Sequence, residues 1–146
     1  LRVMIANGDA DETRARVERL MGKKPELRFQ FIQEETAKRG HSLLSQLDVF
    51  IYSTDHDTFG IAVVEAMAAG VPVFVNDWEV MNEITDDGKL ATIYKTKDEK
   101  DLLEKFMLFL QTKETYKQKA NEVSTIVRQK YSIEKYIDNL KIVYNQ

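Results

Sequence analysis

A chain of 146 residues, 43% of them hydrophobic and 31% charged, fits one globular domain that is long enough to bury a core. No apolar run approaches the roughly 18 residues that span a bilayer, and the absence of cysteine excludes disulfides and thiolate metal sites. The net charge of −3 gives no overall attraction to nucleic acid. The first residues, LRVMIANGD, lack the cationic start of a signal peptide. They also lack an initiator methionine, so we expect a fragment of a longer protein.

The first half of the chain alternates short apolar runs with helical patterns. We predict strands near residues 1–6, 27–32, 48–52, 71–75 and 90–94, and helices near residues 9–21, 43–47 and 59–70. Such alternation is typical of parallel strands joined by right-handed crossovers. The runs VFIY and VPVFV lack polar alternation, which indicates strands covered on both faces. The patterns therefore predict an α/β fold, with a Rossmann-like parallel sheet of about five strands flanked by helices.

The second half of the chain has helical periodicity. Thr96 and Glu99 have the spacing of a capping box, and an amphipathic pattern follows them as far as Leu110. Two more helical patterns cover residues 116–131 and 133–144. We therefore expect extra C-terminal helices, and a single Rossmann-like domain over residues 1–146 without an interdomain linker.

The stretch STDHDTFGIAVVEAMAAGVPVFV, residues 53–75, is the main candidate for a ligand site. Ligands of doubly wound sheets bind beyond the carboxyl ends of the strands, and this stretch begins where the third strand ends. It leads into a helix that we expect to begin near Phe59, and Gly60 would let a ligand approach the backbone closely. Free N–H groups at such a helix start favour a phosphate or sugar oxygen.

Two acids in this stretch each have two interpretations. Glu65 lies beside the expected core-facing stripe of Ile61, Val64 and Ala68. Its carboxylate either accepts hydrogen bonds from a vicinal diol, or it is an exposed helix carboxylate or part of a local salt bridge. Asp57 either contacts a ligand or caps the helix by accepting from its free N–H groups, and the two roles are compatible.

Other polar residues are weaker candidates. His56 is a loop histidine, and the acids of the tripeptide Asp9-Ala10-Asp11 either hold a metal or, in the case of Asp9, cap a helix. Residues 86–88, Asp-Asp-Gly, indicate a turn. Trp78 follows the fourth strand, where it either covers a ligand pocket or packs beneath a loop.

The run DTFGIAVVEAMAAGVPV, residues 57–73, resembles the signature of family 4 glycosyltransferases. That signature has two glutamates separated by seven residues, with Phe-Gly after the first and Glu-Ala-Met-Ala around the second. The runs LRVMIANGD, LLSQLDVFIYS, VMNEI and the C-terminal YSI also resemble segments of this family, so the resemblance covers most of the chain. Members are retaining enzymes of the GT-B type, built from two Rossmann-like domains.

The resemblance implies a role for each site residue. Glu65 would hold the ribose hydroxyls of a donor nucleotide, and Asp57 would contact the transferred sugar in the catalytic site. Backbone N–H groups near Phe59, Gly60 and Ile61 would face the sugar and the diphosphate. No cofactor and no metal are implied, because the helix dipole and basic side chains offset the diphosphate charge.

The sequence departs from the family pattern in two ways. Asp57 stands where the family has Glu, so its reach is one methylene shorter, and His56 or Asp55 is an alternative for sharing its role. The family's phosphate-binding Arg and Lys precede the first residue of this chain, and neither Arg2 nor the lysine pair at 23–24 matches them. We therefore expect a C-terminal, donor-binding domain that lacks its own start and the acceptor-binding domain.

The resemblance implies an enzyme that moves a sugar from a nucleoside diphosphate sugar to a glycan or lipid-linked acceptor, and a fragment that is inactive alone. We expect a cytoplasmic location, which includes the inner face of the membrane, and peripheral membrane association of the full-length protein. Two alternatives stay open. One is a nucleotide-sugar epimerase of the same fold, and the other is a non-enzymatic receiver-like signalling module with Asp9, Asp11, Asp55 or Asp57, and Lys95. A receiver requires magnesium, whereas the transferase domain does not.

Overall fold

The computed structural model describes residues 2–6, 28–32, 44 and 46–144, together with Ala15 and Arg19. It divides the chain into two compact units, Leu1–Gly40 and His41–Gln146. Each unit is described by itself below.

The first unit contains two parallel strands, as the apolar runs predicted. Strand β1 (Arg2–Ala6) pairs with β2 (Arg28–Ile32) over their full lengths. Ala15 and Arg19 are helical, in agreement with the helix predicted for residues 9–21. The rest of that helix, including Asp9 and Asp11, lies outside the described residues.

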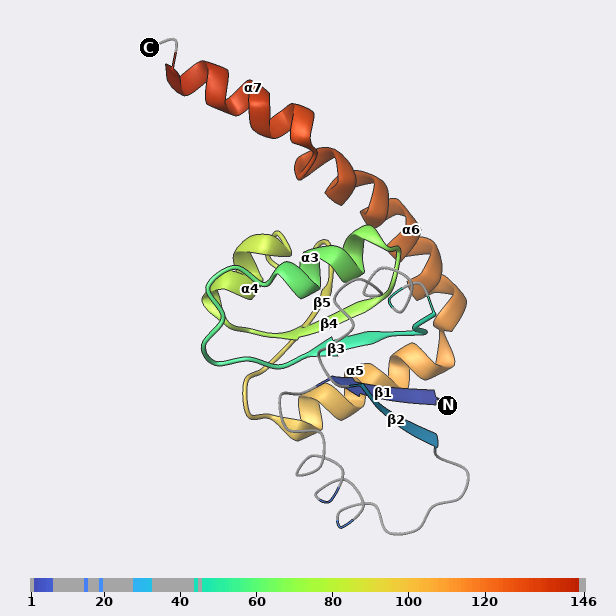
Figure 1. The fold of residues 1–146 in the computed structure, drawn as a ribbon. Coiled ribbons are helices and arrows are strands. Elements are labelled where there is room, and N and C mark those ends of the chain that lie inside the picture. Colours follow the sequence, from blue (N-terminus) through green and yellow to red (C-terminus); the bar gives the residue numbers. More distant parts are fainter. Residues whose placement is uncertain are drawn as a thin grey trace. The chain divides into compact units, whose positions relative to one another are not determined.

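The second unit is built on a sheet of three parallel strands, β3 (Phe50–Tyr52), β4 (Val73–Asn76) and β5 (Thr92–Tyr94). Their order is β3-β4-β5, so β4 is central (Figure 1). The α/β class and the parallel pairing are thus confirmed, and each of the five predicted strands is found. The sheet of this unit has three strands rather than about five, because β1 and β2 pair with each other in the first unit.

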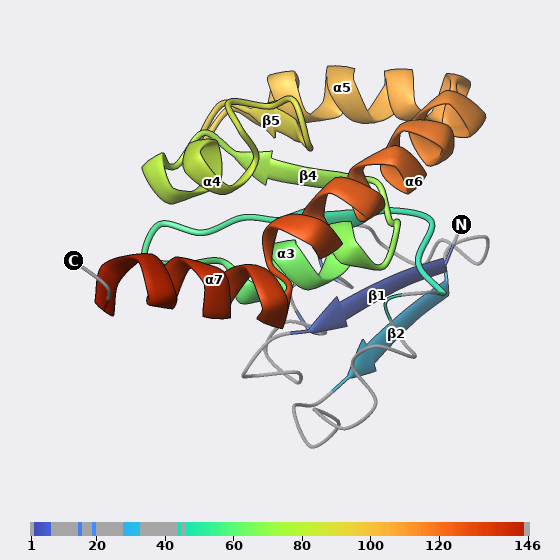
Figure 2. The same cartoon turned by 90° about the horizontal axis from the view of Figure 1, so that it is seen from above.

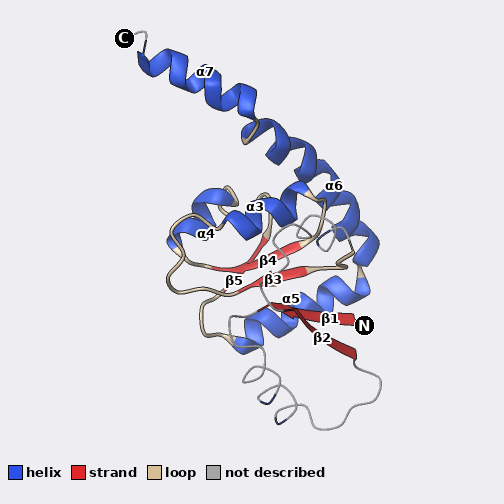
Figure 3. Cartoon of the chain, viewed as in Figure 1, coloured by secondary structure: helices blue, strands red, loops and turns tan. Residues whose placement is uncertain are grey.

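Five helices of the second unit are described. They are α3 (Ile61–Ala68), α4 (Glu79–Ile84), α5 (Glu99–Gln111), α6 (Lys113–Lys130) and α7 (Ile133–Tyr144). Figure 3 shows α3 and α4 on one face of the sheet and α5 on the other. The layers agree with the expectation of strands covered on both faces.

Strand β4 explains this layering, because its side chains alternate between two apolar clusters. Val73 and Val75 pack with α3, α4 and α6, whereas Phe74 packs with Phe109 of α5 and Tyr94 of β5. The ring of Phe74 lies 5.9 Å from that of Phe109 in an edge-to-face arrangement, which is a favoured geometry for aromatic pairs. All four residues of β4 are buried, so the sheet has no solvent-facing side at its centre.

The buried face of α3 differs from the expected one. The buried side chains of α3 are those of Val63, Ala66 and Met67, and those of Val64 and Ala68 are partly buried. Ile61, which we expected to face the core, is 63% exposed. Every residue of α3 except Glu65 is apolar, so periodicity alone does not determine which side is buried.

The start of α5 also differs from the prediction. Asp98 is its N-cap residue, and the Asp98 side chain accepts from the N–H of Asp101 at 3.0 Å. Thr96, predicted to form a capping box with Glu99, instead donates its N–H to Asp77 Oδ1 at 2.7 Å. A tertiary partner at the end of β4 therefore replaced the local capping contact.

Helix α6 holds the end of α3. Ser124 Oγ and Arg128 Nε both donate to the carbonyl oxygen of Ala68, at 2.7 and 2.8 Å. A cation and a hydroxyl at the C-terminus of a helix satisfy its free carbonyls and complement its dipole. Helix α7 follows the bounds predicted from the sequence, contains no buried residue, and runs away from the three-stranded sheet (Figure 1). Helix α6, in contrast, lies beside α3 (Figure 2). No described helix combines the length and apolar character needed to cross a membrane.

Candidate functional site

The connection between β3 and α3 is organised by the carboxylate of Asp57. Its Oδ1 accepts from the N–H of Phe59 at 2.9 Å and from that of Gly60 at 2.8 Å. Its Oδ2 accepts from the Tyr52 hydroxyl at 2.5 Å. Asp57 therefore has the capping role considered from the sequence, although it acts on the turn before α3 rather than on the helix itself.

These hydrogen bonds determine the charge state of the Asp57–Tyr52 pair. The Tyr52 hydroxyl, followed by the N–H groups of Phe59 and Gly60, lowers the pKa of Asp57 below its ordinary value. Burial, followed by the hydrogen bond to Asp57, raises the pKa of Tyr52 to about 12. At neutral pH, the carboxylate is thus an anion and the phenol is its proton donor. A carboxylate has about four lone-pair positions, so three protein donors leave about one acceptor position for a ligand.

The start of α3 offers backbone donors. The N–H groups of Val63 and Val64 bond to the Gly60 carbonyl at 2.9 and 3.1 Å, whereas those of Ile61 and Ala62 have no partner among the described residues. No side chain caps this helix through its N-cap residue, Gly60. Two unpaired amides and the positive end of the helix dipole together favour an anionic ligand here.

Gly60 is required by its backbone conformation and by its packing. Its φ angle is 72°, in the left-handed region that disfavours side chains with a Cβ. A Cβ at this position would lie 2.9 Å from Ile84 Cδ1 and 2.9 Å from Met81 Cε, both on α4. The close approach expected at Gly60 is therefore made on the buried side by α4.

Glu65 lies on the exposed side of α3. It is four residues from Ile61, so both residues share one face of the helix, and both are exposed. The Glu65 carboxylate has no ion pair or hydrogen bond within the described part of the chain. Of the interpretations considered from the sequence, the local salt bridge is thus absent from these residues, and an exposed helix carboxylate and a ligand-binding carboxylate both fit the structure.

A buried amide that the sequence analysis missed connects the loops around the site. Asn76, at the end of β4, is 1% exposed. Its Oδ1 accepts from the N–H of Thr54 at 3.1 Å, and its Nδ2 donates to the Thr54 carbonyl at 2.7 Å and to Thr96 Oγ1 at 3.1 Å. The signal in the sequence was a polar residue at the end of an otherwise apolar strand, where burial makes a hydrogen-bond partner obligatory.

The remaining candidates lie around this loop. His56 is exposed, with its Nε2 3.5 Å from Asp55 Oδ1. Phe59 is half exposed, and its ring meets that of Tyr131 edge-on at 6.3 Å. Trp78 is the N-cap residue of α4 and is 36% exposed. Within the described ranges, no group of three or more acidic, histidine or cysteine side chains is placed to hold a metal ion.

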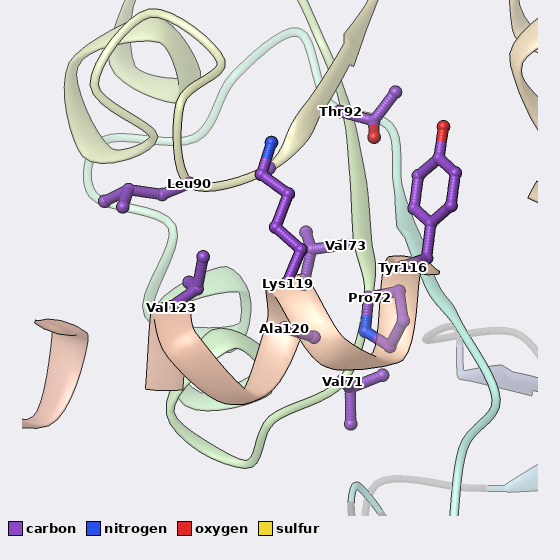
Figure 4. Close-up of a pocket in the computed structure, with 10 residues that line it drawn as sticks. Val71, Pro72, Val73, Leu90, Thr92, Tyr116, Lys119, Ala120 and Val123 are labelled. Carbon is purple, nitrogen blue, oxygen red and sulfur yellow. The ribbon is translucent and has the colours of Figure 1, made fainter. Parts of the chain in front are cut away.

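A small hollow lies at the opposite end of the sheet. Its volume is about 20 Å³, and it is lined by the first residues of β4 and β5, by the residues just before them, and by α6; Pro72, Thr92 and Lys119 are among these residues (Figure 4). That volume accommodates about one water molecule. The hollow is at the amino ends of the strands, so it is separate from the loop that carries Asp57.

Comparison with known sequences identifies a family and two kinds of relative. The sequence model of the family described as "Glycosyl transferases group 1" matches residues 3–125. A "Phosphatidyl-myo-inositol mannosyltransferase" of Mycobacterium tuberculosis is 33% identical over 90 residues, which cover 61% of this chain and 22% of that protein. A "Probable sucrose-phosphate synthase" of Thermosipho melanesiensis is 30% identical over 104 residues, covering 70% of this chain and 23% of that protein. This chain therefore spans less than a quarter of the length of these curated relatives.

Solved structures share the fold at low identity. Anabaena Alr3699/HepE in complex with UDP and glucose aligns with a TM-score of 0.77 and 16% identity, covering 92% of this chain and 35% of that one. TarM aligns with a TM-score of 0.77 and 14% identity, covering 100% of this chain and 29% of that one. The likeness confirms the expected α/β architecture of GT-B enzymes.

Proposed function

This chain belongs to the group 1 glycosyl transferases, and on that premise we propose that it is the donor-binding part of an enzyme that transfers a sugar from a nucleoside diphosphate. The observation that carries the proposal is the exposed face of α3. There, the amides of Ile61 and Ala62 stand one turn from the carboxylate of Glu65, and none of these groups has a partner among the described residues. Family membership argues against a receiver-like module. The position of Tyr52 is a second argument, because it stands at the end of the third strand, where the phosphoacceptor acid of a receiver belongs.

The amides at the start of α3 are the proposed site for the diphosphate. Backbone N–H groups at a helix N-terminus bind phosphate oxygens, and the dipole favours their negative charge. During transfer, the bond between the sugar carbon and the diphosphate oxygen breaks, and the nucleoside diphosphate leaves with the bonding electrons. Donors fixed before the reaction stabilise this developing charge without reorganising.

Glu65 and Asp57 then have separate roles. The Glu65 carboxylate accepts hydrogen bonds from the ribose diol of the donor. Asp57 offers its remaining acceptor position on Oδ2 to a hydroxyl of the transferred sugar, while its Oδ1 holds the turn at Phe59 and Gly60. Asp57 is thus both the anchor of the loop and the proposed catalytic-site acid.

The relatives support the proposed donor and indicate a range of acceptors. HepE has been solved with UDP and with UDP-glucose, which supports a nucleoside diphosphate sugar as the ligand here. The names of the curated relatives include a mannosyltransferase of phosphatidyl-myo-inositol and a sucrose-phosphate synthase. We infer a glycan or lipid-linked acceptor that binds outside the loops described here.

Binding measurements on the Glu65→Gln variant test the donor site. Glu65 has no described partner in the free protein, so the variant should keep wild-type stability while it binds a nucleoside diphosphate about 10- to 150-fold more weakly. This range corresponds to the roughly 1.5–3 kcal/mol of a charge-assisted hydrogen bond. Glu104→Gln, an exposed carboxylate on α5, is the matched control and should bind like wild type.

Isothermal titration with UDP, GDP and ADP, with and without a chelator, gives these affinities. Asp57→Asn should spare the free nucleoside diphosphate and weaken the nucleotide sugar. If Glu65→Gln binds like wild type, the ribose assignment is wrong. In an NMR titration with a nucleoside diphosphate, amide chemical-shift changes that are confined to residues 9–11 and are abolished by the chelator would overturn the proposed site in favour of a metal-dependent one.

A further inference from the structure

We propose that Asn76 is a positioning residue that holds the donor-binding loop in its binding geometry, an inference that rests on the proposed function. Asn76 ends the central strand β4 and is 1% exposed. Its side-chain amide makes hydrogen bonds to Thr54 in the loop after β3 and to Thr96 in the loop after β5. One side chain therefore connects the carboxyl ends of all three strands, and we call its hydrogen bonds to Thr54 and Thr96 the brace.

The amide holds Thr54 at both of its backbone groups. Asn76 Oδ1 accepts from the Thr54 N–H at 3.1 Å, and Nδ2 donates to the Thr54 carbonyl at 2.7 Å. This two-point contact extends the pairing of β3 and β4 past Tyr52, where the regular strand ends. The direction in which the chain leaves the sheet is thereby determined three residues before Asp57.

Two further contacts brace the same region from β5. Thr96 Oγ1 accepts from Asn76 Nδ2 at 3.1 Å and donates to Asp77 Oδ1 at 2.5 Å. The hydroxyl of Tyr94 donates to the carbonyl of Tyr52 at 3.2 Å. The Tyr94 contact holds Tyr52 from β5. The hydroxyl of Tyr52 in turn bonds to Asp57, which holds the turn before α3.

The chemistry of the brace requires an amide. Thr54 presents a donor and an acceptor, so its partner must supply an acceptor and a donor at once, which the planar Asn amide does. Aspartate has no donor for the Thr54 carbonyl or for Thr96. Glutamine would add one methylene at a residue that is 1% exposed, and extra volume at a buried position is destabilising.

The brace bears on binding because the ligand groups lie on the segment that it holds. Asp57, the amides of Ile61 and Ala62, and Glu65 all follow Thr54 without an intervening strand. A loop released at Thr54 would adopt several conformations, and the donor would bind only to the fraction of molecules in the binding-competent one. The apparent dissociation constant rises in proportion as the competent fraction falls.

The test compares variants of the 146-residue chain in binding of UDP and UDP-glucose. Asn76→Ala removes the whole brace, and Thr96→Val removes only its β5 arm. The control is Thr85→Val, which loses a buried hydrogen bond from Thr85 Oγ1 to the Met81 carbonyl, 2.6 Å long, at the C-terminal end of α4. All are measured at a temperature where thermal unfolding shows each variant folded.

We expect Asn76→Ala to weaken the binding of both ligands by about tenfold or more, since the variant loses three hydrogen bonds, which together are about one decade or more in an equilibrium constant. Thr96→Val should weaken them by a smaller factor, and Thr85→Val should stay within about twofold of wild type. Amide chemical shifts in residues 54–61 should move in Asn76→Ala and not in Thr85→Val. That pattern separates positioning from a general loss of stability.

Each outcome decides between the two ideas. A folded Asn76→Ala variant that binds both ligands like wild type overturns the positioning role and leaves the donor site standing. Equal weakening by Asn76→Ala and Thr85→Val has the same meaning, because the effect then follows stability alone. If Asn76→Ala does not fold, Thr96→Val with unchanged affinity and unchanged loop shifts overturns the role. Wild-type protein that binds neither UDP nor UDP-glucose, nor any other nucleoside diphosphate, overturns the proposed function itself.

Discussion

Replacement of Asp57 by alanine should lower the free energy of unfolding by about 2–3 kcal/mol at neutral pH. The loss of an Asp cap on two backbone N–H groups costs typically about 1 kcal/mol. The hydrogen bond from the Tyr52 hydroxyl to a charged acceptor adds roughly 1.5 kcal/mol, and its loss leaves that hydroxyl without its partner. Asp57→Asn should cost only about 1 kcal/mol, because Asn caps the turn as Asp does but is a neutral partner for Tyr52.

Urea unfolding followed by the fluorescence of Trp78 measures these losses. Trp78 is the one tryptophan of the chain and lies at the start of α4, so it reports on the unit that contains Asp57. With a slope of about 1–3 kcal/mol per molar urea, the alanine variant should unfold at roughly 1 M less urea. A double-mutant cycle of Asp57→Asn with Tyr52→Phe should give a coupling energy of about 1 kcal/mol.

The pH dependence of the Asp57 variants gives an independent check. The folded pKa of Asp57 is lowered, so its stabilisation is present above the unfolded value of about 3.9 and is lost as the pH falls through the folded value. The difference between wild type and Asp57→Ala should therefore narrow in acid. Asp55→Ala is the control, since Asp55 is exposed and, among the described residues, its carboxylate pairs with the exposed His56 alone; the variant should change stability by less than about 0.5 kcal/mol. The reasoning is refuted if Asp57→Ala and Asp55→Ala cost the same.

Two further predictions concern the same turn. Gly60→Ala should destabilise the chain by about 2–3 kcal/mol, from its φ of 72° and from the approach of a Cβ to Ile84. Gly88→Ala should cost only about 1 kcal/mol, because its φ is 84° but a Cβ there would lie no closer than 3.4 Å to a neighbour. Equal losses of unfolding free energy for the two variants would exclude a contribution of packing against α4 at Gly60. In alkaline absorbance titration, Tyr52 should ionise at about 12, so its contribution to stability is complete below about 10 and lost as the pH rises to about 12. Tyr52→Phe should lower the amplitude of the late absorbance step by one tyrosine, because burial also raises the pKa of Tyr94 and leaves that residue to ionise late. Asp57→Asn should lower the pKa of Tyr52 part of the way, because burial persists. A late step of undiminished amplitude in Tyr52→Phe would contradict the assignment.

The sequence by itself determined the order of elements and the location of the candidate site. Apolar runs without alternation predicted β3 and β4, and the bounds predicted for α7 agree with the structure, because local periodicity reports which elements can bury a face. The spacing of Asp57, Phe59, Gly60 and Glu65 pointed to the family that the comparison confirms. These features depend on neighbours within a few residues, so they are visible without a tertiary structure.

Only the tertiary structure decided how the site is held. The partners of Asn76 lie 20 and 22 residues away, and the contact of Tyr94 with Tyr52 spans 42 residues, so no local pattern marks them. No local pattern marks the exposure of Ile61 either. Likewise, the sequence does not show that Thr96 bonds to Asp77, 19 residues away, instead of forming the predicted capping box. A buried polar group must find a partner wherever the fold brings one. For this reason the sequence alone proposes Asp57 and Glu65 as site residues, whereas only the structure shows the hydrogen bonds that Asp57 already makes with Tyr52, Phe59 and Gly60.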